Sequence, residues 1–375
     1  MNVLITGAEG FIGKNLLVHL QERKEVVIQT FTRSDDLASL PERVANADFI
    51  FHLAGINRPQ DPLEFTTGNV DLTRALADAV RGCGRQVPLL YSSSTQAAAD
   101  NVYGVSKRGA EEVLQELQAQ SGSPVFLFRL PNVFGKWARP NYNSAIATFC
   151  HNIARDLPIQ INDPQACINL VYIDDVIRCF LEVMHGEHAG KVFVEVQPQY
   201  SASVGDIAEH LRAFRDSRNS LITEPVGTGF MRALYSTYVS YLPQELFTYE
   251  VPKYGDERGV FVEMLKTRNS GQFSYFTAHP GVTRGGHYHH TKTEKFLVIK
   301  GTANFRFCHL VSGDFYELQT SGEKPVIVET VPGWTHDITN IGDEEMIVML
   351  WANEILDREL PDTYSKPLSA PIKRN

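Results

Sequence analysis

The sequence has few cysteines and no long apolar run. Its five cysteines are odd in number, lie far apart and never form a CxxC pair, so we interpret them as reduced packing residues. No apolar stretch approaches bilayer-spanning length, and residues 1–13 lack the basic segment, apolar run and cleavage site of a secretory leader. These absences predict a cytoplasmic protein with no membrane span.

Positive charge is also scarce. The chain has 35 basic and 44 acidic residues, which gives a formal net charge of −9. Binding to a nucleic-acid backbone needs a basic face that displaces counterions from the phosphates. The charge balance therefore argues against a nucleic-acid partner. The length of 375 residues, with 43% hydrophobic side chains, allows two or three folded domains.

Two patterns divide the chain, and neither contains repeats or low-complexity segments. Up to about Val196, short apolar runs alternate with helically spaced stretches, which is typical of βαβ units and a parallel sheet. The expected strands are residues 3–6, 26–31, 49–54, 88–92 and 125–129, with helices at 63–81 and 101–120.

From Tyr254 onward, short β-rich runs alternate with turn signals. The sequence thus predicts a doubly wound α/β domain over residues 1–245 and an all-β domain over residues 246–375. Residues 223–248 are interpreted as the end of the first domain plus a connector.

Three glycines, Gly7, Gly10 and Gly13, connect the first expected strand to an amphipathic helix. In that context glycines allow a tight turn and a close approach of the backbone to a pyrophosphate, and the helix N-terminus offers unpaired N–H groups. A chance triplet in a loop is the alternative. The placement favours a dinucleotide site that also includes Phe11 and Ile12.

The second expected strand lacks the acidic residue that binds the ribose 2′-hydroxyl of NAD. It ends in Phe31-Thr32-Arg33-Ser34, and a guanidinium with a hydroxyl can hold a 2′-phosphate. We therefore predict a preference for NADPH, mediated by Arg33 and Ser34. The alternative is that Arg33 is only a solvated loop charge.

Tyr103 and Lys107 lie four residues apart at the start of an expected helix, so their side chains share one face. Reduction of a ketone requires a proton for the developing alkoxide, and a lysine cation pulls the pKa of a nearby phenol toward neutrality. We predict Tyr103 as the acid and Lys107 as its tuner. For the hydroxyl that holds the carbonyl oxygen we select Ser94, with Ser93 and Thr95 as alternatives.

These motifs together resemble the extended short-chain dehydrogenases over roughly residues 1–245. Further matching segments are Leu53-Ala54-Gly55, Asn69, and Arg129 through Gly135. The resemblance implies that the substrate is a nucleotide-linked sugar. It implies cofactor contacts at Leu53, Ala54, Gly55, Asn69, Tyr103 and Lys107, and substrate contacts at Asn132, Arg139 and Asn143. One departure is the run from Thr95 to Ala99, which lacks the Tyr-Gly that many members carry there.

The β-rich half contains four side chains of metal-ligand type, namely His287, His289, Glu294 and His336. Two histidines two apart on a strand point the same way, and a glutamate with a distant histidine can complete a facial set. His290 is an adjacent alternative. With its glycines, the pattern resembles both halves of the cupin signature. We expect zinc, although iron, nickel or manganese would fit the same residues.

The same half also resembles the sugar-nucleotide 3,5-epimerases, a different cupin branch, at residues 256–263 and 283–288. The resemblance implies that His287 removes a proton next to a ketone. It also implies substrate contacts at Arg258, Glu263 and Arg284. If His287 binds the metal, the base must be another group. No tyrosine follows Trp351, where that family keeps its proton donor.

An epimerising domain joined to a ketone-reducing domain would perform two steps on one substrate. This architecture, with Phe230 to Tyr238 in the connector, resembles a family of capsular polysaccharide synthesis enzymes over nearly the whole chain. That resemblance implies a UDP-linked 2-acetamido-2,6-dideoxy-4-keto-hexose, epimerised at C3 and reduced at C4 by NADPH. The product would be UDP-2-acetamido-2,6-dideoxy-L-talose, on the route to N-acetyl-L-fucosamine, and the enzyme a homodimer.

Three alternatives stay open. The cupin could only bind sugar or build the dimer, which would leave a simple reductase. The chain could be a redox-sensing module that holds NADP without chemistry, against which Tyr103 and Lys107 weigh. It could also be a 4-epimerase or dehydratase with tightly held NAD. Arg33 opposes this last alternative, as does the lack of an acidic residue beside the serine run.

Overall fold

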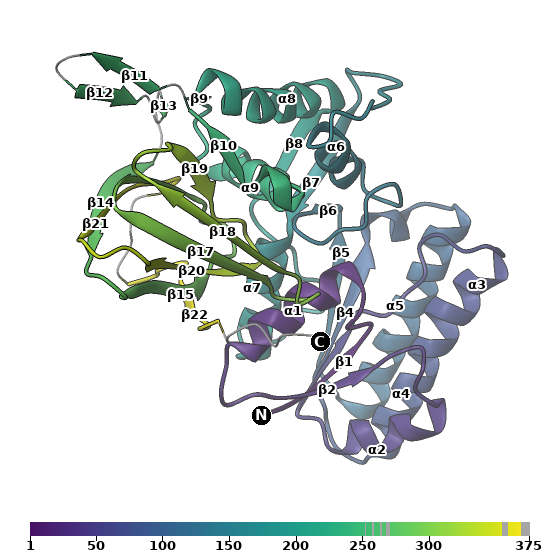
Figure 1. The fold of residues 1–375 in the computed structure, drawn as a ribbon. Coiled ribbons are helices and arrows are strands. Elements are labelled where there is room, and N and C mark those ends of the chain that lie inside the picture. Colours follow the sequence, from purple (N-terminus) through teal and green to yellow (C-terminus); the bar gives the residue numbers. More distant parts are fainter. Residues whose placement is uncertain (252, 257–258, 263–264, 268–270, 355–358, 369–375) are drawn as a thin grey trace. The chain divides into compact units, whose positions relative to one another are not determined.

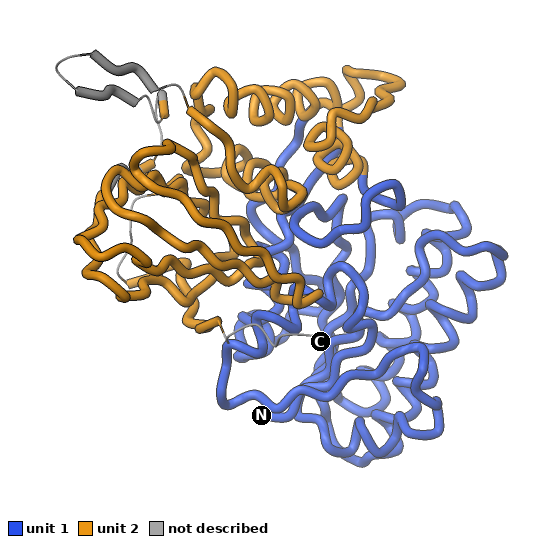
Figure 2. Tube along the Cα trace, in the orientation of Figure 1, with its two compact units in different colours: residues 1–144, 168–202 blue, residues 145–167, 203–375 orange. Residues whose placement is uncertain are grey.

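The computed structural model describes residues 1–251, 253–256, 259–262, 265–267, 271–354 and 359–368. The chain divides into two compact units, which Figure 2 shows in different colours. The first unit contains residues 1–144 and 168–202, and the second contains residues 145–167 and 203–375. No helix in the described part of the chain is long and apolar enough to cross a membrane.

The first unit is built on a five-stranded parallel sheet with the strand order β2-β1-β3-β4-β5 (Figure 1). The strands are β1 (Asn2–Thr6), β2 (Val27–Phe31), β3 (Phe49–His52), β4 (Leu89–Ser94) and β5 (Val125–Leu130). Each overlaps an expected strand. Their near-continuous apolar runs are what a parallel sheet covered on both faces requires.

Helices cover both faces of this sheet (Figure 1). One face packs against α2 (Leu40–Ala45), α4 (Leu72–Gly82) and α5 (Val102–Ser121) in a single apolar core. The other face lies under α1 (Phe11–Gln21) and α7 (Ile173–Met184). There, the Phe180 ring of α7 lies 6.2 Å from Phe51 and 4.8 Å from Phe128. The doubly wound α/β prediction is confirmed.

The strand order positions a ligand site. From β1 the chain moves to the sheet edge at β2 and then returns past β1 to β3, so the strand order reverses between β1 and β3. In doubly wound folds ligands bind outside the carboxyl ends of the strands at such a reversal.

The helix expected over residues 63–81 is not uniform. It consists of α3 (Leu63–Phe65), a π-helical segment (Thr66–Asp71) and α4. π-Helical turns are rare and often occur at functional sites. This one contains the predicted cofactor residue Asn69. The first unit also holds most of a small sheet that the sequence did not predict, formed by β6 (Asn132–Phe134), β7 (Cys167–Tyr172) and β8 (Gln199–Ser203).

The second unit joins helices to an all-β region. Its helices are α6 (Ala145–Ile153), α8 (Val204–Ser220) and α9 (Gly229–Val239). The short strands are β9 (Ile222–Thr223), β11 (Lys253–Asp256), β12 (Gly259–Val262) and β13 (Lys266–Thr267). The segment 223–248, interpreted as the end of the first domain plus a connector, contains α9 and belongs to this second unit.

Two five-stranded antiparallel sheets make up the rest of this unit. The first has the order β10 (Thr248–Glu250), β19 (Val326–Glu329), β16 (Glu294–Lys300), β21 (Met346–Ala352) and β14 (Gln272–Ala278). The second has the order β18 (Phe315–Ser321), β17 (Thr302–His309), β20 (Trp334–Asn340), β15 (Thr283–Tyr288) and β22 (Tyr364–Ser365). The all-β prediction for the C-terminal part is confirmed.

The compact units follow a different division from the predicted boundary between residues 245 and 246. Residues 145–167 and 203–245 group with the C-terminal strands. This division reflects packing within the folded chain and does not test where one domain ends and the next begins. The boundary between residues 245 and 246 therefore stays a prediction.

Candidate active site and metal centre

The glycine loop lies at the carboxyl end of β1, where the strand order reverses. Gly7 has a φ of +74°, and a Cβ there would lie 2.6 Å from the backbone nitrogen of Ala54. A Cβ at Gly13 would lie 2.2 Å from the carbonyl oxygen of Gly7. Any side chain at either position would thus displace backbone. α1 begins at Phe11 without a side-chain cap or an acidic residue in its first turn, which leaves its N–H groups open to an anion.

The predicted cofactor residues converge beside Gly55. A Cβ on Gly55 would lie 3.0 Å from Oδ1 of Asn69 and 3.2 Å from Nζ of Lys107. Asn69 is buried, and its amide accepts from the Ile56 N–H at 2.8 Å and donates to the Ser106 hydroxyl at 2.9 Å. The π-helical segment therefore fixes the loop after β3 to α5.

Arg33 and Ser34 are exposed just past the end of β2. The next residue, Asp35, is acidic, but its carboxylate accepts from the Thr32 N–H at 2.8 Å and from Arg43 at 2.5 Å. The Thr32 backbone and hydroxyl hold the pKa of Asp35 below its ordinary value. The Asp35 carboxylate is thus already bound by Thr32 and Arg43. Arg33 forms no ion pair with any of the described residues.

Tyr103 lies in the first turn of α5, which Asn101 caps by accepting from the Gly104 N–H at 2.8 Å. The Ser94 side chain, at the end of β4, acts on the Tyr103 phenol and lowers its pKa. The Ser93 hydroxyl instead donates to the buried Glu111 carboxylate at 2.5 Å. Of the serine alternatives, Ser94 is thus the one that acts on the tyrosine.

The pKa of Tyr103 differs from the expected direction. Burial raises it above its ordinary value, and the interaction with Ser94 opposes this only in part. Lys107 is itself buried and donates to the carbonyl oxygen of Ser92 at 2.9 Å. Burial lowers the pKa of Lys107 to about 8. The Tyr103 phenol therefore stays protonated, as a proton donor must, and its pKa is not pulled toward neutrality.

Of the predicted substrate residues, Asn132 begins β6, and Arg139 and Asn143 lie on the loop that follows β6. Asn132 is exposed and donates to the carbonyl oxygen of Asn169 at 3.1 Å, and Asn143 is also exposed. The Arg139 guanidinium lies 5.3 Å from the centre of the Tyr142 ring. Arg58 lies 5.8 Å from the same ring. Arg58, three residues after Gly55, was not among the residues predicted from the sequence.

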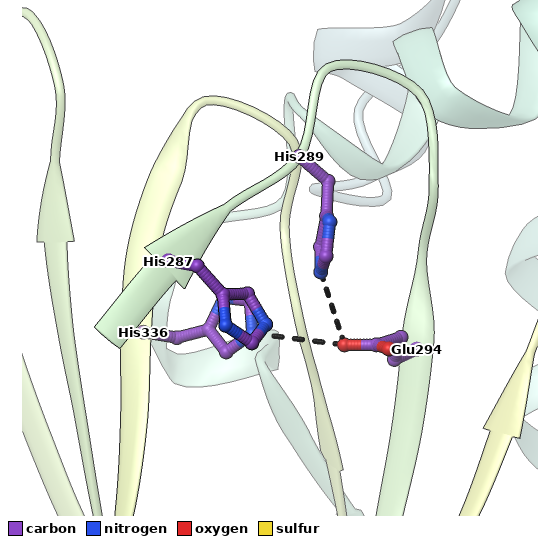
Figure 3. Close-up of side chains that lie close together, drawn as sticks. All are labelled: His287, His289, Glu294 and His336. Carbon is purple, nitrogen blue, oxygen red and sulfur yellow. Dashed lines mark hydrogen bonds and ion pairs between the residues drawn. The ribbon is translucent and has the colours of Figure 1, made fainter. Parts of the chain in front are cut away.

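The four predicted metal ligands come together in the β region, as Figure 3 shows. Their candidate ligand atoms all lie within 4.8 Å of one another. A β-bulge between Gly285 and His287 places His287 opposite His336 of β20. His289 follows β15 directly, and Glu294 begins β16.

The contacts within the cluster leave the ring nitrogens of His336 available to bind a metal ion. Nε2 of His289 lies 3.1 Å and Nε2 of His336 lies 3.6 Å from the same Glu294 oxygen. Both ring nitrogens of His336 are buried without a hydrogen-bond partner. Burial, His336 and His289 lower the pKa of His287 to about 3, so its imidazole is neutral. Three imidazoles around a carboxylate form a donor set that suits a divalent transition metal.

Other predicted residues of the β region lie outside this cluster. His290, the alternative ligand, packs its ring 4.9 Å from the Tyr364 ring. Arg284 is exposed, donates to the carbonyl oxygen of Thr277 at 3.1 Å and stacks on Phe276. Arg258 and Glu263 lie outside the described residues.

Two polar residues next to the cluster were missed from the sequence. The Lys292 ammonium lies 2.9 Å from the second oxygen of Glu294. Asp362 accepts from three consecutive backbone N–H groups in the loop between His289 and Glu294. A lysine two residues before a glutamate is a local signal that could have been noticed. Asp362 is 72 residues away from the first of these N–H groups, and no spacing pattern would have revealed it.

Fold and site together define a doubly wound nucleotide-binding protein joined to an antiparallel β region. Residues 3–194 match the "NAD dependent epimerase/dehydratase family", and residues 254–364 match the "Polysaccharide biosynthesis C-terminal domain". A Pseudomonas aeruginosa protein named UDP-2-acetamido-2,6-beta-L-arabino-hexul-4-ose reductase is 63% identical over 365 residues, which cover 97% of this chain and 98% of that protein.

Solved structures agree with this assignment. The capsular polysaccharide assembling protein CapF of Staphylococcus aureus is 40% identical, with a TM-score of 0.68 over 98% of this chain and 100% of CapF. The chain belongs to the NAD dependent epimerase/dehydratase family, in the branch that contains CapF. UDP-glucuronic acid 4-epimerase of Bacillus cereus, 20% identical, covers 57% of this chain and 84% of its own with a TM-score of 0.51, which shows only the shared fold.

Proposed function

We propose that this chain is an NADPH-dependent reductase of a UDP-linked 2-acetamido-2,6-dideoxy-4-keto-hexose in surface polysaccharide synthesis. The observation that carries the proposal is that Ser94 lowers the pKa of Tyr103, while Lys107 of the same helix lies beside Gly55 at the carboxyl end of the sheet. The near full-length similarity to the P. aeruginosa reductase supports this substrate class.

In the reduction step, NADPH supplies the hydride that is added to C4 of the sugar. The glycine loop and the start of α1 hold the pyrophosphate, and Arg33 with Ser34 holds the 2′-phosphate. Tyr103 donates its proton to O4, to which Ser94 donates a hydrogen bond, so the ketone becomes an alcohol. The Lys107 ammonium, fixed by the Ser92 carbonyl, stabilises the negative charge that develops.

Two arginines provide a site for the substrate diphosphate. Arg58 and Arg139 both lie against the Tyr142 ring, and neither has an ion pair among the described residues. Two like charges that share one ring are stabilised when an anion binds between or beside them. Asn132 and Asn143 are both exposed, and they contact the sugar or the nucleotide.

In the β region, we propose epimerisation at C3 before reduction, within a cupin that spans residues 246–375. His287, His289, Glu294 and His336 hold a divalent ion, for which zinc fits best. Such an ion supplies Lewis-acid polarisation of the C4 carbonyl, which makes the C3 proton removable. Because all four side chains converge, His287 acts as a ligand, and another group removes the proton. Lys292 serves as the proton donor in place of the missing tyrosine.

The product is then UDP-2-acetamido-2,6-dideoxy-L-talose, a precursor of UDP-N-acetyl-L-fucosamine. One observation favours a second candidate, a reductase whose cupin has no epimerase chemistry. The residue after Trp351 is Ala352 rather than a tyrosine. Arg284 contacts the substrate in either case. We further propose a homodimer, for which light scattering on the purified chain must give twice the monomer mass.

One experiment tests both steps. The protein is incubated with the UDP-linked 4-keto sugar in deuterated water, first without and then with NADPH, and followed by NMR. Deuterium at C3 without cofactor, followed by NADPH-dependent loss of the ketone, is the expected result. NADPH oxidation without exchange leaves the second candidate. Exchange without oxidation contradicts the roles of Tyr103 and Lys107.

A further inference from the structure

The loop between His289 and Glu294 connects two of the four predicted metal ligands. It is held by Asp362, which lies far along the chain from β15 and β16. The Asp362 carboxylate accepts from the backbone N–H groups of His290 at 2.9 Å, Thr291 at 2.7 Å and Lys292 at 2.7 Å. It also accepts from the Thr291 hydroxyl at 2.9 Å. Successive N–H groups that point inward form a nest that binds an anion, and here a side chain of the same molecule fills it.

The backbone of Asp362 contacts the metal cluster more directly. Its carbonyl oxygen lies 2.5 Å from Nδ1 of His289. A carbonyl can only accept, so Nδ1 of His289 carries a proton, and Nε2, which lies 3.1 Å from a Glu294 oxygen, is the ring nitrogen left to bind a metal ion. A partner on the far nitrogen of a metal-bound histidine fixes both its tautomer and its ring orientation.

The segment after Asp362 is attached to the same strand. β22 pairs with β15, with Ser365 opposite His287, and the Lys366 N–H donates to the Gly286 carbonyl at 2.8 Å. The segment from Asp362 to Lys366 thus runs along the strand that carries His287 and ends at the loop that carries His289. We propose that Asp362 is a positioning residue that sets the geometry, and hence the affinity, of the metal centre.

This inference rests on the metal site of the proposed function. Its test measures metal affinity rather than catalysis. The full-length apo-protein is titrated with Zn²⁺ against a chromophoric chelator, as wild type and as Asp362→Asn. The asparagine replaces one acceptor oxygen by an NH₂ group that faces N–H donors. We expect about a 10- to 100-fold weaker Kd for Zn²⁺, the usual effect of losing an outer partner of a metal ligand.

The matched control is Asp343→Asn, which removes an exposed carboxylate from a turn of the same sheets. Its Kd is expected to equal that of the wild type. The unfolding temperature of each apo-protein is measured in parallel, because a merely structural role would lower that temperature and leave the affinity of the folded protein unchanged. Equal Zn²⁺ affinity of folded Asp362→Asn and wild type overturns the proposal.

If Asp362→Asn does not fold, Asp362→Glu decides, because it keeps the charge but moves the carboxylate by one methylene. Weaker Zn²⁺ binding by this variant supports the positioning role, and wild-type binding overturns it. Failure of the wild type itself to bind Zn²⁺ overturns the metal centre and the inference with it. A different result, in which the wild type and the variant bind Zn²⁺ equally well, overturns only the role of Asp362 and leaves the metal centre in place.

Discussion

At the scale of single residues, the burial of Lys107 bears on its proposed catalytic role. Burial lowers its pKa to about 8, since a charged ammonium is disfavoured away from water. The ammonium form exists below that pH and is lost above it. Burial raises the pKa of Tyr103, so the tyrosine remains protonated over this range. We therefore expect kcat for NADPH-dependent reduction to fall as the pH rises through about 8.

The pH profile of kcat under saturating substrate measures this. Lys107→Met is expected to lower kcat by about 100-fold or more and to remove the alkaline limb. Circular dichroism checks that the variant is folded. A wild-type rate that stays constant to well above the pKa of Lys107 would show that its charge plays no part.

We expect Arg33 to determine the choice between the two nicotinamide cofactors. It is exposed and has no acidic partner in the described residues, because Arg43 holds Asp35. Hydrogen bonds to a charged group are worth about 1.5–3 kcal/mol, which corresponds to roughly 10- to 100-fold in binding. Arg33→Ala should raise KM for NADPH by about that factor and leave KM for NADH unchanged.

Steady-state kinetics with both cofactors test this, and Arg81→Ala serves as the control. Arg81 is also a partly exposed arginine but pairs with Asp78 on α4. A wild-type preference for NADH, or an equal rise of both KM values in Arg33→Ala, contradicts the assignment.

Residue-level patterns were predictable where the chemistry is local. The glycine loop, Tyr103 with Lys107, and His287 with His289 all lie within short segments whose spacing has a physical meaning. Arg58 was missed because an arginine in a loop carries no spacing signal. Its role depends on Tyr142, which is far away in the sequence.

At the scale of elements, a buried carboxylate fixes α5 to the sheet. Glu111 is 2% exposed and accepts from Ser93 of β4 at 2.5 Å and from Arg129 of β5 at 2.6 Å. Removal of its charge leaves Arg129, which is partly exposed, without a counter-ion. We expect Glu111→Gln to lower the free energy of unfolding by about 1–3 kcal/mol, the usual cost of a hydrogen-bonded charge discounted for solvent.

Urea unfolding of the full chain measures this loss. Glu112→Gln is the matched control, because Glu112 is the exposed neighbour on the same helix, and its effect should stay within about 0.5 kcal/mol. Equal effects of the two substitutions would show that the buried network adds no stability.

Elements were predictable wherever one periodicity persisted. The five central strands could be identified as apolar runs, and α5 as a long amphipathic helix. The π-helical segment at Asn69 could not be identified, because one extra residue per turn barely changes the spacing of apolar side chains. β6 was missed because it has only three residues, and β8 because its sequence QYSAS is not an apolar run. β7, CINLVY, is as long as β4 and β5 and was overlooked.

At the scale of the whole molecule, the second unit shows what sequence patterns cannot predict. The pattern changes from helical to β-rich near residue 250, which led to a boundary at residue 245. The packing instead joins α8 and α9 to the antiparallel sheets. Ser236 of α9 donates to the carbonyl oxygen of Thr291 at 2.6 Å, in the loop between the predicted metal ligands His289 and Glu294. Such contacts between distant segments leave no periodic trace in the sequence.

A buried ionic network joins α8 to these sheets. Glu329 of β19 is 3% exposed and accepts from Lys295 of β16 and from Arg218 of α8. Lys295 also donates to the Tyr249 hydroxyl of β10 at 3.1 Å. Burial alone would raise the pKa of Glu329, but Lys295 and Arg218 hold it below its ordinary value. The Glu329 carboxylate thus remains charged at neutral pH. Its stabilising effect is lost as the pH falls through the lowered pKa of Glu329.

Replacement of Glu329 by Gln leaves two buried cations without their shared counter-ion, which costs about 3–5 kcal/mol when a buried pair is broken. Because α8 and the strands share this network, their amides should open together. Hydrogen exchange of Glu329→Gln should therefore accelerate in α8, β16 and β19, and not in β1 to β5. Glu111→Gln should give the reverse pattern, since its network lies within the first unit. Faster exchange in β19 without α8 would mean that helix and sheets open independently, and that the boundary at residue 245 separates two cooperative units after all.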